Sequence, residues 1–146
     1  MARIKLTLPE NFSFSTSIPV RITDINYGGH VGNDTILSLL HEARMQYLQS
    51  LGYSELDFAG TGLIMRDVAI EYKNELFYGT ELKAYVAAGD FSHAGFDLVY
   101  ELLIDKDGKE VTIAAAKTGM VCFDYTHRKI VPVPEEAVQK LQNVVL

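Results

Sequence analysis

The sequence has a single cysteine and no long run of apolar residues. Cys122 has no second cysteine for an internal disulfide, and residues 119–123 have the pattern of a strand. We therefore interpret Cys122 as a small buried hydrophobic residue and not as a nucleophile. No window reaches roughly 18 uninterrupted apolar residues, and the first residues lack the apolar segment of a secretory signal. We expect no transmembrane helix and a location in the reducing cytoplasm.

Basic residues are also in short supply. The chain has 13 Lys and Arg against 19 Asp and Glu, a net charge of −6, and a pI near 5.1. A protein that binds duplex nucleic acid needs a basic face to displace counterions, so we expect no nucleic-acid partner. The four histidines and one cysteine show no metal-ligand spacing, and we expect neither a metal ion nor a redox cofactor.

Apolar residues, by contrast, are present in the proportion of a folded domain. Hydrophobic residues make up 48% of the 146 residues and aromatic residues 10%. A chain of this length buries about two-thirds of its surface on folding, which is enough for a core without disulfides or metals. There is no internal repeat, linker or low-complexity segment, so residues 1–146 are predicted to form one domain.

One long amphipathic helix is predicted over residues 35–51. Its apolar residues recur at intervals of three and four, at Ile36, Leu39, Leu40, Ala43, Tyr47 and Leu51. Asn33 or Asp34 suits the N-cap position, and Gly52 stands where a left-handed glycine ends a helix. Because apolar residues cover more than half of its circumference, we expect other structure to cover this helix.

Most of the remaining chain has the pattern of β-strands. Strands are predicted at residues 18–24, 63–72, 80–87, 96–104 and 111–123, with Pro19 near the start of the first. The pair Asp107-Gly108 predicts a hairpin turn between the last two strands. Residues 134–141 begin with proline and two acidic residues, which predicts a short closing helix. A strand, a long helix and four strands in a meander make an α+β domain.

The predicted strands also carry apolar residues on the face turned away from the helix. Ala69, Val99 and Leu103 are examples. One sheet covers one helix on a single side, so this surface needs another partner. We expect a second subunit to bury it, in a homodimer or a homotetramer built from dimers.

A glycine-rich loop precedes the predicted helix and carries the most specific motif of the chain. Residues 20–33 read VRITDINYGGHVGN. This segment resembles the opening motif V-R-x-x-D-x-D-x-x-G-H-V-x-N of hotdog-fold acyl-CoA thioesterases of the 4-hydroxybenzoyl-CoA thioesterase group. The His-Glu-Ala-Arg of residues 41–44, the segments 70–72 and 78–82, and the closing residues 128–134 are also similar to that family. The resemblance covers nearly the whole chain from Phe14.

The resemblance implies a hotdog fold, in which a curled antiparallel sheet wraps around one long central helix. It implies hydrolysis of an acyl-CoA, or of an acyl group on a carrier protein, by attack of water at a site between two subunits. The CoA thioester is then the substrate, and no cofactor is implied. In that family amides of the first helical turn polarise the thioester carbonyl, and Asn33 matches that position. A helix start offers unpaired N–H groups and a positive dipole end, which agrees with this role.

The sequence departs from the motif at the family's catalytic carboxylate. Asn26 stands in place of the second Asp, and an amide neither takes a proton at neutral pH nor forms an acyl anhydride. Asn26 is then either a site residue that holds a water or the carbonyl, or a plain loop amide next to glycine. Asp24 matches the first Asp, and it is either a base or a carboxylate that caps loop amides. A hotdog acyl-CoA-binding protein with impaired catalysis is therefore the alternative function. A dehydratase fits the Gly-His-Val-x-Asn element less well, and a purely structural subunit leaves the glycine-rich loop unexplained.

Two further residues are candidates for acid–base chemistry. A histidine changes charge near neutral pH and can activate water, so His30 is either the base or a loop histidine bonded to backbone. Glu42 lies opposite the apolar stripe of the helix. It is either a solvated surface residue or a replacement carboxylate, since other hotdog thioesterases carry theirs on this helix. Asp67 is a weaker candidate of this kind, and Arg44 is interpreted as a structural anchor.

Contacts to the substrate are predicted around the same loop. They are placed at Tyr27, Gly28, Gly29, Val31, Gly32 and Asn33, with the glycines also serving the backbone geometry. CoA is polyanionic, so an acidic protein needs a local basic patch to bind it. The candidates for contact with the CoA phosphates are Lys73, Lys117, Arg128 and Lys129. Ordinary surface cations are the alternative for any one of them.

Overall fold

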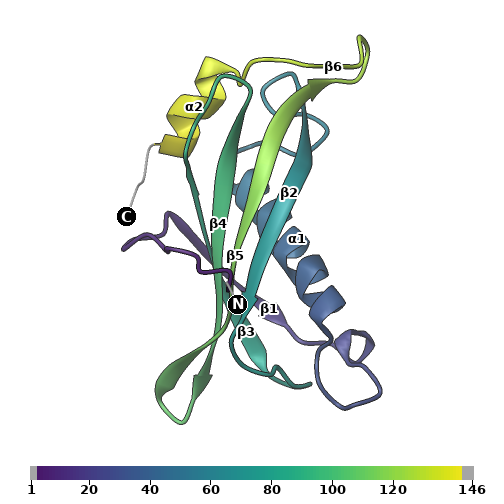
Figure 1. Ribbon diagram of the computed structural model, residues 1–146, viewed down its shortest axis with the longest axis vertical. Helices are drawn as coiled ribbons and strands as arrows, with labels where there is room; N and C mark the ends of the chain where they lie inside the picture. The colour runs from purple at the N-terminus through teal and green to yellow at the C-terminus, as the bar shows by residue number, and fades with distance from the viewer. Residues whose placement is uncertain (1–2, 143–146) are drawn as a thin grey trace.

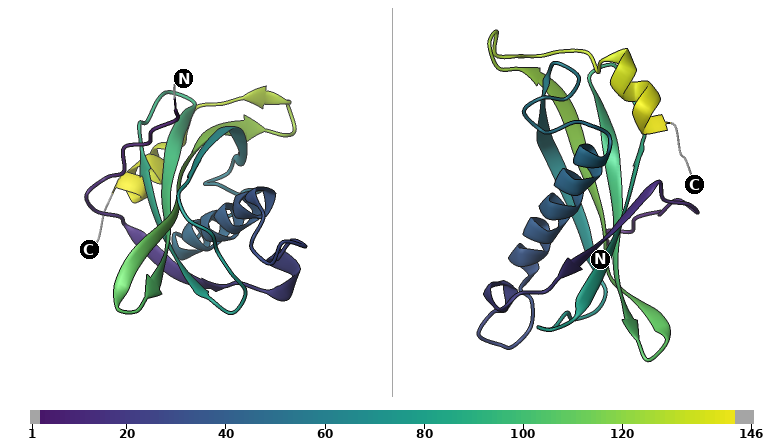
Figure 2. Two further views of the ribbon diagram at one scale, coloured as in Figure 1. Left: turned by 60° about the horizontal axis from the view of Figure 1, so that its bottom comes forward. Right: turned by 180° about the vertical axis from the view of Figure 1, so that it is seen from behind.

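The computed structural model describes residues 3–142 as a curled six-stranded antiparallel sheet with one long helix against its inner face (Figure 1). Two further views show how the sheet bends around that helix (Figure 2). This confirms the predicted α+β hotdog architecture. The elements in chain order are β1 (Phe14–Pro19), the 3-10 turn η1 (Ile22–Asp24), α1 (Asn33–Ser50), β2 (Gly62–Tyr72), β3 (Glu81–Gly89), β4 (Gly95–Lys106), β5 (Lys109–Asp124), β6 (Lys129–Ile130) and α2 (Glu135–Gln142).

Helix α1 forms as predicted but begins two residues earlier. Its N-cap is Gly32, which offers no side-chain cap, and not Asn33 or Asp34. The helix ends at Ser50, and Gly52 adopts a positive φ of 82°, the conformation that favours glycine after a helix. The side chains that α1 buries are Ile36, Leu39, Leu40, Ala43, Arg44, Tyr47 and Leu48. The three-and-four spacing therefore identified the packed face of the helix correctly.

The first strand lies further toward the N-terminus than predicted. β1 covers Phe14–Pro19, so Pro19 ends it, and the prediction of a strand over residues 18–24 is wrong. Residues 22–24 form a 3-10 turn instead, because the Asp24 carboxylate accepts a hydrogen bond of 2.8 Å from the backbone N–H of Arg21. The local side-chain-to-backbone bond outweighs the β propensity of Ile22 and Thr23.

The order of strands in the sheet is β1-β3-β4-β5-β2, with the short β6 on β5 (Figure 1). Only β3, β4 and β5 form a meander, so the prediction of four meandering strands is wrong. β2 crosses to the far edge and pairs with β5, with Leu63 opposite Cys122 and Tyr72 opposite Ala114. The hairpin at Asp107-Gly108 joins β4 to β5 as predicted. β2 is therefore an edge strand, directly after which the chain turns toward the start of α1.

Strand β2 also carries the apolar surface that the single chain leaves open. Met65, Val68 and Tyr72 are 38%, 39% and 47% exposed. A bulge at Arg66 interrupts its register against β5, between Met65 and Asp67. Of the residues predicted to need a partner subunit, Leu103 is already buried within one chain. Among strands β1 to β5, the exposed large hydrophobic residues therefore all lie on the edge strand β2.

The short helix α2 closes the end of the domain at which α1 ends. Its Ala137 and Leu141 are buried, as the predicted helix over residues 134–141 requires. The Tyr53 hydroxyl donates a hydrogen bond of 3.0 Å to Glu136, and the Lys140 ammonium donates one of 3.1 Å to the carbonyl of Leu51. None of the helices in residues 3–142 has the length and apolar character needed to cross a membrane.

Candidate active site

A pocket opens at the start of α1, and we call it the helix-start pocket. Its volume is about 290 Å³, and its lining comes from the loop before α1, the first turn of α1, the end of β2 with the segment after it, and one residue of β5. The lining residues are His30, Val31, Asn33, Ile36, Tyr72, Lys73, Asn74, Glu75, Leu76 and Ile113. Because Gly32 has no side chain to cap the helix, the first backbone N–H groups of α1 are left for a ligand. A helix start also attracts negative charge.

The loop from Asn26 to His30 is closed on itself by hydrogen bonds. The Asn26 side-chain oxygen accepts a bond of 2.9 Å from the N–H of Gly28, and the Asn26 N–H donates one of 3.0 Å to the carbonyl of His30. Gly29 has a φ of 87°, which this turn requires and which only glycine adopts readily. The Asn26 amide nitrogen lies toward Gly32, 3.6 Å from the position that a Cβ would occupy there. Asn26 thus reaches the start of α1 with its amide group.

His30 is held in one orientation at the edge of the helix-start pocket. Its Nδ1 lies 3.1 Å from the carbonyl oxygen of Val31, which accepts a hydrogen bond when Nδ1 carries the proton. In the neutral imidazole the other nitrogen, Nε2, is then an unprotonated acceptor. The contact with backbone therefore leaves Nε2 as an acceptor, and the role of His30 as a base stays a prediction.

The structure separates the other two candidate carboxylates from His30. Asp24 and Glu42 line a different hollow of about 280 Å³ beside α1, together with Arg21 and Ser38. Asp24 is 6% exposed, and its two oxygens are taken by the backbone N–H and the guanidinium of Arg21, at 2.8 and 3.5 Å. This matches the interpretation of Asp24 as a structural carboxylate. Glu42 is exposed and accepts a hydrogen bond of 2.8 Å from Gln46 on the next turn.

Glu75 is a carboxylate in the helix-start pocket that the sequence did not reveal. The segment 75–77 runs antiparallel to residues 30–31, with a bridge between His30 and Phe77 and a hydrogen bond of 2.8 Å from the Val31 N–H to the Leu76 carbonyl. Extending that pairing by one residue places Glu75 opposite Gly32, at the start of α1. The fold thus brings a carboxylate to the helix-start pocket, whose lining does not include Asn26.

Some of the predicted substrate contacts line the helix-start pocket, and others are exposed to solvent. Val31 and Asn33 line the helix-start pocket, whereas the side chain of Tyr27 is fully exposed. Gly32 allows a close approach, since a Cβ there would lie 2.7 Å from the carboxylate of Asp34. Within residues 3–142, no cluster of His, Cys, Asp and Glu side chains has an arrangement that could hold a metal ion.

The four predicted phosphate contacts do not form one patch in a single chain. The Lys117 ammonium lies 2.8 Å from Asp67 and 3.7 Å from Asp97, so its charge is neutralised within the protein. This hydrogen bond from Lys117 lowers the pKa of Asp67 and raises that of Lys117. Lys73 bonds through its N–H to Ile113 on β5, while Lys129 pairs with Asp124 on the same strand. Eleven residues of strand separate those two points, roughly 35 Å at about 3.3 Å per residue.

Arg128 is the last residue of the turn between β5 and β6, and Lys129 is the first residue of β6. Arg128 has a positive φ of 53° in that turn. Lys73 alone of the four lines the helix-start pocket. The predicted set is thus split between opposite ends of the sheet. Arg128 and Lys129 are neighbours in the sequence and in the structure, but the fold places Lys73 at the other end of β5.

Arg44 is buried at 5% exposure, in agreement with its interpretation as a structural anchor. Its Nη1 donates to the hydroxyl of Tyr100, and that hydroxyl lies 2.7 Å from the Thr118 hydroxyl. Arg44 Nε lies 3.5 Å from the carboxylate of Glu55 without a hydrogen bond to it, and within the described chain this atom has no hydrogen-bond partner. The group links α1 to the middle of the sheet.

The fold and the loop motif together define a thioesterase-like domain, and comparison with known proteins agrees. The chain belongs to the Thioesterase-like superfamily, which it matches over residues 20–141.

Individual relatives show the same class of activity. The chain is 26% identical over 134 residues to a 1,4-dihydroxy-2-naphthoyl-CoA hydrolase of Nostoc punctiforme, covering 90% of this chain and 88% of that protein. It is 29% identical over 119 residues to a protein of the same name from Microcystis aeruginosa, covering 80% and 83% of the two chains. A solved 1,4-dihydroxy-2-naphthoyl-CoA thioesterase from Synechocystis superimposes with a TM-score of 0.79 at 22% identity, over 90% of this chain and 96% of that one. These relatives support thioester hydrolysis as the class of activity.

Proposed function

We propose that this protein hydrolyses the thioester of an acyl-CoA, or of an acyl carrier protein, by direct attack of water. The observation that carries the proposal is the uncapped start of α1 opening into a pocket that also holds His30. A tetrahedral intermediate of thioester hydrolysis carries a negative oxygen, and paired N–H groups at a helix start stabilise that charge. The N–H of Asn33, the first residue of α1, is the donor that the family resemblance also selects.

In the proposed mechanism the water oxygen attacks the carbonyl carbon of the thioester. Nε2 of His30 takes one proton from that water as the new carbon–oxygen bond forms. The carbonyl oxygen becomes an oxyanion held by the first amides of α1. When the intermediate collapses, the carbon–sulfur bond breaks and the thiolate leaves with the proton from His30. Glu75 supplies a negative charge to the same pocket and stabilises the imidazolium form of His30.

We further propose that the working unit is a homodimer with a site at the subunit interface. The exposed Met65, Val68 and Tyr72 lie along β2, whose outer edge has unpaired backbone groups. Tyr72 lines the helix-start pocket and donates a hydrogen bond of 3.0 Å to the Asn33 carbonyl, so the open edge and the pocket meet. A second subunit on β2 would cover both. Light scattering at micromolar concentration should give a dimer or a tetramer, and a monomer would contradict the shared site.

The test of the hydrolase proposal is a panel of thioesters followed by release of free thiol. The relatives place 1,4-dihydroxy-2-naphthoyl-CoA first in this panel, followed by benzoyl-CoA and short and medium aliphatic acyl-CoAs. Cys122 is fully buried and burial raises its thiol pKa, so it adds little background to a thiol reagent. We expect turnover of at least one member.

A catalytically impaired acyl-CoA-binding protein is the second candidate function. The observation in its favour is that Asn26 replaces the family's carboxylate and that its side-chain oxygen is already bonded to Gly28. If no member of the panel is hydrolysed above the rate without protein, while calorimetry still detects binding of an acyl-CoA, this function replaces the hydrolase.

A further inference from the structure

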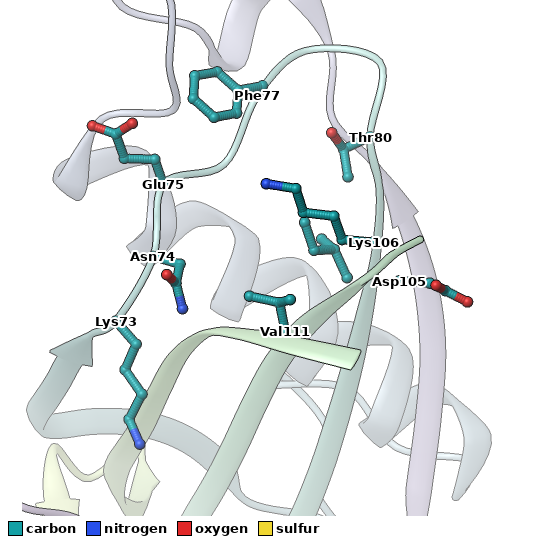
Figure 3. Close-up of a pocket in the computed structure, with 9 residues that line it drawn as sticks. Lys73, Asn74, Glu75, Phe77, Thr80, Asp105, Lys106 and Val111 are labelled. Atoms are coloured by element: carbon teal, nitrogen blue, oxygen red, sulfur yellow. The ribbon is translucent and has the colours of Figure 1, made fainter. Parts of the chain in front are cut away.

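A second pocket lies on the other side of the segment that follows β2, and we call it the hairpin pocket. Its volume is about 550 Å³, within the usual range for small-molecule sites. It lies between residues 73–80 and the tip of the β4–β5 hairpin. Its lining residues are Lys73, Asn74, Glu75, Phe77, Thr80, Ile104, Asp105, Lys106 and Val111 (Figure 3).

The two pockets share one wall. Lys73, Asn74 and Glu75 line both of them. The N–H groups of Lys73 and Asn74 donate hydrogen bonds of 2.9 and 3.2 Å to the carbonyl of Ile113, and the Asn74 amide donates one of 2.7 Å to the carbonyl of Thr112. The wall is therefore tied to β5 and keeps the two pockets in fixed positions next to each other. A ligand long enough to cross the wall can occupy both.

The hairpin pocket is positive at its centre, although its lining residues have two charges of each sign. Figure 3 shows the Lys106 ammonium pointing into the pocket and the carboxylates of Glu75 and Asp105 pointing away from it. The Asp105 carboxylate accepts a hydrogen bond of 3.0 Å from the N–H of Gly108, so the hairpin turn uses it. In contrast to Lys117, neither Lys73 nor Lys106 forms an ion pair with any residue in the range 3–142.

The remaining lining suits a ring attached to phosphates. Ile104 and Val111 are the aliphatic residues of the lining, and Phe77 is 50% exposed, where a flat ring has a surface to pack on. Thr80 and Asn74 add hydroxyl and amide groups to the walls. An unpaired ammonium beside an aromatic ring and aliphatic side chains is a combination that binds a nucleotide better than it binds an acyl chain.

We propose that the hairpin pocket binds the 3′-phosphorylated ADP end of a CoA thioester whose acyl end lies in the helix-start pocket, with Lys106 as the principal phosphate contact. This rests on the proposed hydrolase function and makes it more specific. A nucleotide site selects CoA thioesters over carrier proteins, because a carrier protein presents the same pantetheine arm with a phosphate but without the adenosine. Lys106 replaces Lys117, Arg128 and Lys129 as the expected contact.

The first experiment measures binding, so that it does not depend on turnover. Calorimetry compares free CoA, dephospho-CoA and pantetheine on the wild type, on Lys106→Gln and on Lys129→Gln. Lys129→Gln is the matched control, because it removes the same charge from the opposite end of β5. Loss of one charge-assisted contact corresponds to about a tenfold weakening. We expect Lys106→Gln to weaken CoA binding by about tenfold and to leave pantetheine binding unchanged, whereas Lys129→Gln changes neither.

The second experiment measures kcat/KM with the same acyl group on CoA, on phosphopantetheine and on pantetheine. The wild type should favour the CoA thioester by about tenfold or more over the phosphopantetheine thioester, and Lys106→Glu should abolish that preference through KM. Equal kcat/KM for these two thioesters, or a loss of CoA affinity in Lys129→Gln but not in Lys106→Gln, would overturn the proposal. Lys106-dependent CoA binding without any hydrolysis would retain the nucleotide site and remove the hydrolase function.

Discussion

Nη1 of Arg44 in the central helix donates a hydrogen bond of 3.2 Å to the hydroxyl of Tyr100 in the middle of the sheet. The Tyr100 side chain is fully buried, and burial raises the pKa of its hydroxyl. This contact joins the two layers of the fold by a polar group where the surrounding core is apolar. Loss of this contact leaves a buried charge without its partner.

Tyr100→Phe should therefore destabilise the protein more than Arg44→Met. Removing the hydroxyl leaves Nη1 of Arg44 and the hydroxyl of Thr118 without their bond, at a cost of about 1–3 kcal/mol in the free energy of unfolding. Arg44→Met removes the buried charge itself, and Tyr100 keeps its bond to Thr118. Urea unfolding of both variants measures the two values, and the reverse order would show that the ion pair with Glu55 dominates.

His30→Gln tests the proposed base through the pH dependence of kcat/KM. General-base catalysis is typically worth about 10²–10⁴ in rate, and we expect a loss of that size. A histidine base places the acid limb of the profile about two pH units above that of a carboxylate base. The wild type should show the higher limb and His30→Gln should lack it. An unchanged profile in His30→Gln would assign the proton transfer to another group.

Glu75→Gln should lower the rate, whereas Glu42→Gln should not. Both residues are exposed glutamates, but only Glu75 lines the helix-start pocket. We expect roughly tenfold loss of kcat for Glu75→Gln, because the imidazolium that forms during turnover loses a nearby negative charge. Glu42→Gln is the matched control, with the same change on the outer face of α1. Loss of activity in Glu42→Gln alone would show that the carboxylate needed for turnover is Glu42 on α1.

Asn26→Asp restores the carboxylate of the family motif, and the structure gives its geometry. One oxygen of the new side chain keeps the bond to the Gly28 N–H, and the other takes the place of the amide nitrogen that lies toward Gly32. A carboxylate there faces the positive end of α1. We expect a modest rise in kcat and a new limb at lower pH in the rate profile. A fall in kcat would show that the amide nitrogen itself contributes to the site.

Asp67→Asn tests the ion pair with Lys117 on the outer face of the sheet. The pKa of Asp67 is lowered in the folded protein, so the pair stabilises the fold above the unfolded carboxyl pKa of about 3.9 and this stability is lost as the pH falls through the lower folded value. Asp67 is 57% exposed, which limits the effect to about 1 kcal/mol or less. Unfolding free energies of wild type and variant should differ at pH 7 and converge as the pH falls through the lowered pKa of Asp67 in the folded protein.

Much of the fold was predictable because its signals are local. The spacing of Leu40, Ala43 and Tyr47 on one face specifies a packed helix within a few turns, and Gly52 and the Asp107-Gly108 pair specify their turns by backbone conformation. The placement of β2 was not predictable in this way. A strand pattern determines which face is apolar but contains nothing about which strand it pairs with, and β2 pairs with β5 across a long stretch of chain.

The same limit applies to the candidate site. His30 and Asn33 were predictable because they share one short motif, and the structure places both in one pocket. Glu75 and Lys106 were missed because Glu75 stands in the polar segment after β2 and Lys106 at the end of β4. Only the fold brings Glu75 to the loop before α1 and Lys106 to the segment after β2. Conversely, Lys117 was predicted to contact phosphate because its partner Asp67 stands fifty residues earlier in the sequence. Only the pairing of β2 with β5 brings the two side chains together.

The wall formed by Lys73, Asn74 and Glu75 also fixes the distance between the two pockets, and so the length of a ligand that occupies both. Lys73 and Asn74 are bonded to the carbonyl of Ile113, so the spacing of the pockets follows from the geometry of the sheet and does not change as a flexible loop would. In the proposed binding mode the nucleotide lies on one side of this wall and the reacting carbonyl on the other, so the wall selects for the length of the arm that joins them. Thioesters whose arm is a few atoms shorter or longer would then bind at one end only, with the reacting carbon out of reach of His30.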